Sequence, residues 1–255
     1  IGKLIGYKEV AFYTVAFFIG NVVRVPARAI GSICMPLVAS AWGKDDLVAI
    51  KDIYVKSAIN QLIFGGLIFL GIWLNVDDAL SLLPEKFQGG RLVVFFIAFS
   101  QLFNVATGVN GLIIANSKYF RFDLYSNFML LCITLFTNFI FIPSSSPLAS
   151  YDIVGINGAA FATALSVLFF NIIKMIFLYW KIGIQPFSLR TLYTIALLIV
   201  IYYLSLYIPV SENVYLNLLW RSFYILLLFL PAMYLMNLSK DINQVIEEFA
   251  RKIIK

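Results

Sequence analysis

The sequence predicts an all-α integral membrane protein. Of its 255 residues, 62% are hydrophobic and only 13% are charged, which is roughly half the charged fraction of a soluble domain. Seven apolar segments reach about 20 residues, the length that a helix needs to cross the hydrocarbon core of a bilayer. They are apolar on all sides and do not alternate as the strands of an outer-membrane barrel do. We therefore expect a bundle of about seven transmembrane helices.

Turn-like stretches separate the seven segments. The expected spans are approximately residues 10–41, 57–75, 92–115, 124–143, 153–180, 191–209 and 215–237. The connections between them include GKDD, LPEKFQGG, PSSSP, QPFS and PVSEN, which are rich in Gly, Pro, Ser and charge. None of these connections is long enough to form a soluble domain.

The C-terminal segment, residues 238–255, has a different pattern. Apolar residues recur at helical spacing and charged residues take the opposite face, which is typical of an amphipathic helix in the headgroup region. The apolar set is Ile242, Val245, Ile246, Phe249 and Ile253. The alternative is a solvated tail with some helix. Neither interpretation indicates catalysis.

Basic residues in the connections predict the orientation. Eleven Lys and Arg residues fall on one side of the seven spans and four on the other, and the richer side is normally cytoplasmic. The eleven are Lys44, Lys51, Lys56, Lys118, Arg121, Lys181, Arg190, Lys240, Arg251, Lys252 and Lys255; the four are Lys3, Lys8, Lys86 and Arg91. The C-terminus is then cytoplasmic and Ile1 lies outside. Because no translocation signal precedes Ile1, we expect an upstream helix or lobe.

Two arginines lie deep in the first apolar segment. Arg24 and Arg28 are four residues apart and share a helical face with Asn21. An arginine at the centre of a bilayer costs about 3 kcal/mol on insertion scales, so two of them imply a partner or a wet cavity. Pro26 lies between them and is expected to bend the helix there, as a hinge. The alternative is that both arginines pair with backbone carbonyls or with carboxylates upstream of this sequence.

The remaining intramembrane charges favour an anionic ligand. No Asp or Glu lies well inside any span, so the sequence offers no counter-ion for the arginines. Lys174 adds a third cation, which we expect to reach toward the cytoplasmic interface. Guanidinium groups suit phosphate and carboxylate oxygens, and we expect a phosphate or diphosphate group to bind Arg24, Arg28 and Lys174. We expect Asn21, on the same face as the arginines, to contact the substrate as well.

Uncharged polar and small residues form two further patterns. Gln101 and Asn104 share one face of the third segment, where amides either bind sugar hydroxyls or hold helices together, the second being favoured. In the fifth segment, Gly155, Gly158 and Ser166 lie on one narrow face, and small residues at this spacing let two helices pack closely.

The sequence offers no sign of catalysis, cofactor or metal. It contains no histidine, P-loop, GxGxxG, HExxH or GxSxG motif. Cys34 and Cys132 both lie inside apolar runs, so neither a disulfide framework nor a zinc site is indicated. We expect no enzymatic activity, no cofactor and no nucleic-acid partner.

Three stretches together resemble a known family. They are EVAFYTVAFFIGNVVRVPARAIGSICMPLVASAWGKDD, LPEKFQGGRLVVFFIAFSQLF and VGINGAAFATALS, which follow one another across about 180 residues. Their order and spacing are similar to those of Wzx-type flippases, the polysaccharide-export branch of the multidrug/oligosaccharidyl-lipid/polysaccharide exporter (MATE-like) superfamily. The last 65 or so residues carry no distinctive signature.

The resemblance implies a transporter with two lobes and a central cavity, of which this chain would be the C-terminal lobe. It implies movement of undecaprenyl-diphosphate-linked oligosaccharide across the bacterial inner membrane, for surface polysaccharide (O-antigen) synthesis. By position, Arg24 and Arg28 would meet the diphosphate. The expected partners are this lipid-linked substrate, membrane lipids and other polysaccharide-assembly membrane proteins.

Two other functions remain open at this stage. A cation-coupled multidrug antiporter of the same superfamily would need intramembrane carboxylates, which this chain lacks. A membrane-embedded glycosyltransferase or polymerase of envelope synthesis would need reactive groups in a sizeable loop. The longest external loop offers Asp77, Asp78 and Glu85, without an obvious base and nucleophile.

Overall fold

The structure is a bundle of α-helices. The computed structural model describes residues 6–84, 89–209 and 211–253, and this part of the chain contains no β-strand. Four residues named above lie outside the described residues: Lys3, Glu85, Lys86 and Lys255. The side chains of three others are not described: Lys8, Phe249 and Ile253. Five of the described helices are long and apolar enough to cross a bilayer. The chain is thus an all-helical protein of the multi-pass membrane type.

The helices follow the apolar segments of the sequence. The long paths are α2 (Tyr7–Asn21) continued by α3 (Val25–Gly43), then α4 (Leu47–Leu74), α8 (Phe120–Phe141), α9 (Gly155–Ile182) and α11 (Val214–Leu235). Two apolar helices are shorter, α6 (Arg91–Ala106) and α10 (Leu189–Ser205). The remaining pieces are η1 (Val22–Arg24), α5 (Val76–Ser81), α7 (Asn110–Ala115), η3 (Ala149–Tyr151) and α12 (Lys240–Ile253).

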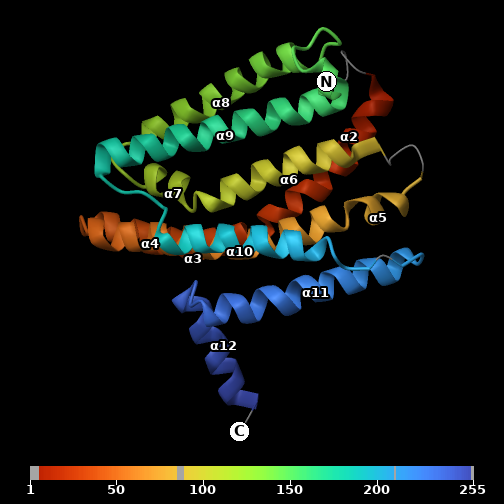
Figure 1. Ribbon diagram of the computed structural model, residues 1–255. Coiled ribbons are helices and arrows are strands. Elements are labelled where there is room, and N and C mark those ends of the chain that lie inside the picture. Colours follow the sequence, from red (N-terminus) through yellow and green to blue (C-terminus); the bar gives the residue numbers. More distant parts are fainter. Residues whose placement is uncertain (1–5, 85–88, 210, 254–255) are drawn as a thin grey trace.

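The first apolar path is interrupted next to the two arginines. The chain forms a 3-10 turn at Val22–Arg24, and α3 then begins with Pro26 in its first turn. Pro26 cannot donate a backbone hydrogen bond to the carbonyl of Val22, and the first turn of a helix is where this loss matters least. The path changes direction where α2 meets α3 (Figure 1). The expected bend is therefore present, as a restart of the helix just before Pro26.

The third expected span, residues 92–115, is not one continuous helix. The helix α6 ends at Ala106, and α7 begins only at Asn110. Gly108 has φ +63° in the connecting turn, and a Cβ there would lie 3.0 Å from the backbone nitrogen of Ala58. Only glycine adopts this conformation freely and permits so close an approach of two backbones. The break lets the turn between α6 and α7 make hydrogen bonds to both α4 and α9.

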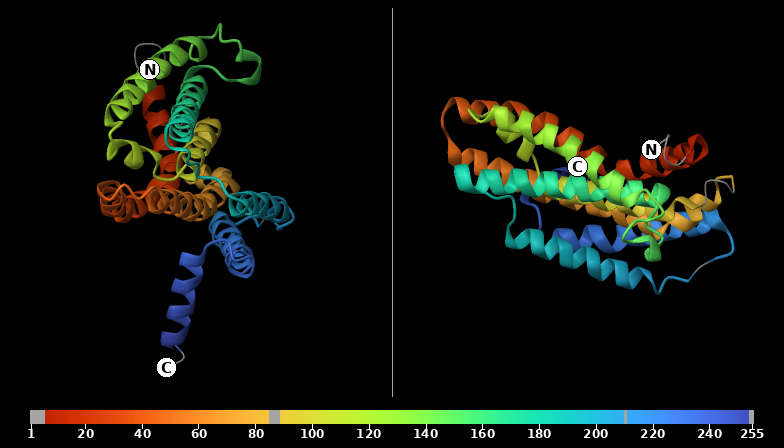
Figure 2. Two further views of the ribbon diagram at one scale, coloured as in Figure 1. Left: turned by 90° about the vertical axis from the view of Figure 1, so that its left-hand side faces the viewer. Right: turned by 90° about the horizontal axis from the view of Figure 1, so that it is seen from above.

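The helices pack as a succession. Along it, α8 contacts α9, α9 contacts α6, α6 contacts α4, and α4 contacts α10 and α11 (Figures 1 and 2). The first path runs along one side, with α2 on α6 and α3 on α4. Outward-facing aromatic and aliphatic side chains are exposed along α8 and α11, as expected for helices that face lipid; they include Phe128, Phe136, Phe139, Leu219 and Leu227.

The C-terminal helix α12 leaves the bundle at a turn that is held to α4 by hydrogen bonds. The hydroxyl of Ser239 donates to Asn60 Oδ1 of α4, and Asn60 Nδ2 donates to Asp241 Oδ2 at 3.0 Å. Ile242 packs against the apolar cluster formed by α4, α10 and α11. Val245 is 65% exposed on the projecting part. The structure has a helix where the sequence predicts one, and this helix projects away from the bundle (Figure 1). Its place in the headgroup region stays a prediction.

Candidate anion-binding cavity

A cavity of about 410 Å³ opens beside η1 and α3. Its walls come from η1 and α3, from α4, from the turn between α6 and α7, and from α8 and α9. Its charged and amide-bearing residues are Arg24, Arg28, Gln61, Asn104, Asn110, Asp123, Asn127 and Lys174. The cavity therefore gathers most of the intramembrane polar groups that stand out in the sequence.

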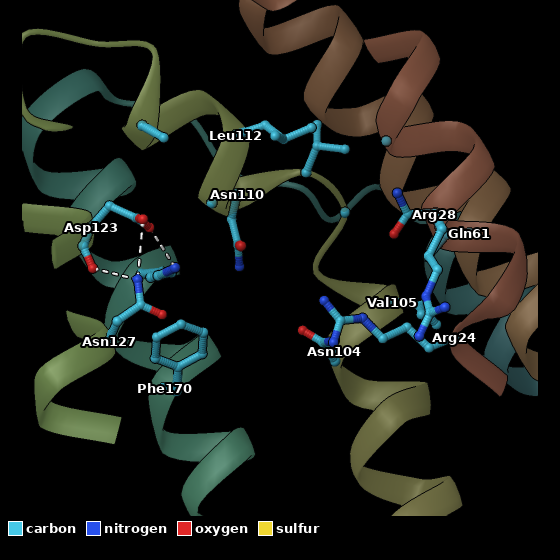
Figure 3. Close-up of a pocket in the computed structure, with 17 residues that line it drawn as sticks. Arg24, Arg28, Gln61, Asn104, Val105, Asn110, Leu112, Asp123, Asn127 and Phe170 are labelled. Atoms are coloured by element: carbon cyan, nitrogen blue, oxygen red, sulfur yellow. Dashed lines mark hydrogen bonds and ion pairs between the residues drawn. The ribbon is translucent and has the colours of Figure 1, made fainter. Parts of the chain in front are cut away.

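Arg24 and Arg28 line this cavity together, as their spacing predicts. Both side chains are exposed in the isolated chain, and neither makes a hydrogen bond or ion pair with any residue that the structure describes. Figure 3 shows both arginines on the same wall as Asn104 and Gln61. Two guanidinium groups, each with five N–H donors, thus border an open space with their donors unused.

The opposite wall carries an ion pair. Lys174 Nζ lies 2.7 Å from Asp123 Oδ1 and 4.0 Å from the centroid of the Phe170 ring. Asn127 donates to the other carboxylate oxygen, Asp123 Oδ2, at 3.2 Å. Figure 3 shows Asp123, Asn127 and Phe170 across the cavity from the arginines.

Lys174 differs from the sequence expectation. We expected its ammonium to reach the cytoplasmic interface, but the residue is only 4% exposed and is held by Asp123. The reason is that Asp123, in the first turn of α8, lies at the same depth as Lys174 of α9. A charge buried to this extent is normally paired, and Asp123 provides the partner.

An amide network fixes the turn between α6 and α7. Asn171 Oδ1 of α9 accepts hydrogen bonds from Thr107 Oγ1 at 3.0 Å and from Asn110 Nδ2 at 3.1 Å. All three residues are buried. These hydrogen bonds between side chains hold the turn against α9. Polar side chains of the expected third span thus hold helices together, which is the role that we favour for the amides of that span.

The structure does not bring every predicted site residue to the cavity. Asn21 donates to the carbonyl oxygen of Phe17 in its own helix, and Gln101 is buried and accepts from Asn104 Nδ2 at 3.3 Å. Neither residue lines the cavity. Arg24, Arg28, Asn104 and Lys174 do line it.

Two lining residues carried a weaker signal in the sequence. Asp123 lies at the edge of its apolar segment, so the sequence predicts that it is near a helix end, and Gln61 is an amide of the kind that often holds helices together. Helical spacing within one segment cannot show that the first turn of α8 lies beside Lys174, eight residues before the end of α9. Only the packing of α8 on α9 brings Asp123 to Lys174.

The charges of the cavity do not cancel. Three cations, Arg24, Arg28 and Lys174, face one carboxylate, that of Asp123. Because the carboxylate is paired with Lys174, two positive charges remain without a partner among the described residues. Such a site prefers anions, and its guanidinium groups suit planar or tetrahedral oxyanions.

Comparisons with known proteins identify no relative. No protein-family model matches the chain, and no curated protein or solved structure does so either.

Proposed function

We propose that this chain forms one lobe of a flippase that carries lipid-linked oligosaccharide across the bacterial inner membrane. The proposal is carried by the guanidinium groups of Arg24 and Arg28, which border an open cavity among apolar helices and have no partner among the residues that the structure describes. Placing them there is costly in a bilayer. A diphosphate group that enters the cavity would offset this cost by accepting their hydrogen bonds.

The remaining cavity groups fit the rest of such a substrate. The Asn104 and Gln61 amides lie beside the arginines and are suited to sugar hydroxyls. The lipid tail would stay in the hydrocarbon phase. Transport requires no bond to be made or broken. It requires only a lower free-energy barrier for moving charged and hydroxyl groups through the hydrocarbon core.

The depth of the cavity suits loading from the cytoplasmic leaflet. Lys174 lies eight residues before the end of α9, which is about 12 Å along the helix. Asp123 lies in the first turn of α8. The basic residues of the connections assign these helix ends to the cytoplasm. The C-terminus and α12 are on the same side in this proposal.

The lobe has seven crossings in this proposal. The shorter helices α6 and α10 add two crossings to the five long spans, and α7 extends α6 after the break. A second lobe, expected from the resemblance, would close the open side of the cavity, and alternating access would expose it to each side in turn.

Two rival functions receive less support. A drug or cation antiporter needs a carboxylate free to bind cations, and the carboxylate in the cavity, Asp123, already holds Lys174. An envelope glycosyltransferase would use the loop acids, but Asp77 pairs with Arg91 at 3.3 Å and Asp78 pairs with Arg221 at 3.0 Å.

Leaflet movement of a fluorescent undecaprenyl-diphosphate oligosaccharide, in proteoliposomes that contain this lobe together with its second lobe, tests the proposal. The double variant R24Q/R28Q should insert normally and lose transport, whereas K44Q/K51Q, which removes two exposed cations outside the cavity, should retain it. Transport by R24Q/R28Q at the wild-type rate would contradict the proposal. Formation of a new glycosidic product in the same vesicles would favour the enzyme instead.

A further inference from the structure

We propose that the Asp123–Lys174 ion pair is a displaceable pair, in which Asp123 holds the place of a ligand anion and Lys174 becomes the third cation when the ligand arrives. This inference rests on the proposed function, since it concerns the same cavity. It assigns Asp123 a role as a competitor that sets how tightly the cavity holds its anion.

The hydrogen bonds of Lys174 leave room for a second anion. An ammonium group has three donors, and Asp123 Oδ1 is the one acceptor of Lys174 among the described residues. The face of the Phe170 ring lies 4.0 Å from Nζ and stabilises the positive charge without accepting a conventional hydrogen bond. Donors therefore remain for an oxyanion in the cavity.

The carboxylate can leave more easily than the ammonium. The Lys174 side chain is 5% exposed, whereas the Asp123 side chain is 26% exposed. Asp123 also keeps a second partner, Asn127, on its other oxygen. A buried cation is strongly destabilised when its only counter-ion is removed. If a phosphate group takes the place of the Asp123 carboxylate beside Lys174 as that carboxylate moves away, the ammonium of Lys174 always has an anion next to it.

Gly111 keeps the ammonium open to the cavity. A Cβ on Gly111 would lie 3.3 Å from Lys174 Nζ and 3.9 Å from Asp123 Oδ1. Gly111 is in α7, directly after the turn that the amide network holds in place. The backbone of α7 thus approaches the ion pair without covering it, and both Gly111 and Lys174 line the cavity with the arginines.

The test is binding of pyrophosphate to the purified chain in detergent, with thermal unfolding as a check on folding. D123N removes the competing carboxylate and should bind roughly tenfold more tightly than wild type, because a close charge pair is worth at least this much. D123N/K174Q, which avoids an unpaired buried lysine, should lack this gain and bind within about twofold of wild type. The matched control D52N removes a carboxylate from the exposed Asp52–Lys56 pair and should change nothing.

G111A separates direct contact from overall charge. It adds a methyl group against Nζ and leaves every charge in place, so it should weaken pyrophosphate binding if Lys174 contacts the anion. Unchanged affinity in both D123N and G111A, with wild-type binding intact, would overturn the displaceable pair and leave the proposed function standing. Equal binding by wild type and R24Q/R28Q, or no binding by wild type, would overturn the proposed function and with it this inference.

Discussion

Gly158 of α9 lies directly against the carbonyl group of Phe141 in α8, so closely that a Cβ on Gly158 would overlap the carbonyl oxygen. Farther along the same face, Ser166 Oγ lies 3.1 Å from Thr137 Oγ1 of α8. The small-residue face of α9 is therefore the surface on which α8 packs. The sequence prediction that this face serves close packing is confirmed at these residues.

Substitution of Gly158 by alanine should destabilise the protein. The methyl group would force α8 and α9 apart, and overpacking of this kind costs about 1–3 kcal/mol. Thermal unfolding in detergent measures the loss. The control is G71A in α4, where a Cβ meets nothing within 4 Å and where alanine favours the helix by up to about 1 kcal/mol. Equal stability of G158A and G71A would show that the α8–α9 contact is looser than described.

Alanine substitution at Gly108 and at Gly183 distinguishes the energetic cost of a positive φ from the cost of crowding a Cβ. Both have positive φ, +63° and +78°, but a Cβ on Gly108 would crowd Ser57 and Ala58, whereas one on Gly183 meets nothing within 4 Å. G183A should therefore cost about 1–2 kcal/mol from backbone conformation alone. G108A should cost about 2–4 kcal/mol, because crowding adds to it. Unfolding transitions of the two variants check this order, and a more stable G108A would contradict it.

The two ion pairs formed by Asp77 and Asp78 of α5 should contribute unequally to stability. Arg221 Nη1 donates to both Asp78 Oδ2 and the carbonyl oxygen of Leu74, and both charged side chains are at most 20% exposed. The Asp77–Arg91 side chains are more than half exposed. D78N should therefore cost about 1–3 kcal/mol and D77N less than about 1 kcal/mol. Comparable losses in unfolding experiments would contradict this difference.

The sequence was sufficient for those features that depend on one segment alone. Long apolar runs predict seven spans, of which five are helices long enough to cross a bilayer in the described part of the chain, and the four-residue spacing predicts that Arg24 and Arg28 share a wall. It was insufficient where two segments meet. The break after Ala106 depends on the backbone contact of Gly108 with α4, and the burial of Lys174 depends on Asp123 from another helix.

Of the two amides of the third span, the structure brings one to the cavity and not the other. Gln101 and Asn104 are three residues apart and appeared to form one polar stripe, but only Asn104 reaches the cavity. Gln101 is buried one turn earlier and accepts a hydrogen bond from Asn104. Helical periodicity gives the face of a helix, and the neighbouring helices decide how far along that face the cavity extends.

In the proposed transporter, Arg24 and Arg28 face water and an anion rather than lipid. Cysteine substitution at Ala27 and Gly31, which line the cavity, tests it most directly in a C132S background. A membrane-impermeant thiosulfonate reagent requires water, because the thiolate is the reactive form. Val25 is 55% exposed but does not line the cavity, so V25C serves as the lipid-facing control. We expect labelling of A27C and G31C, protection of both by pyrophosphate, and little labelling of V25C. If A27C and G31C stay unlabelled, or react no faster than V25C and without protection, the arginines do not border an anion passage.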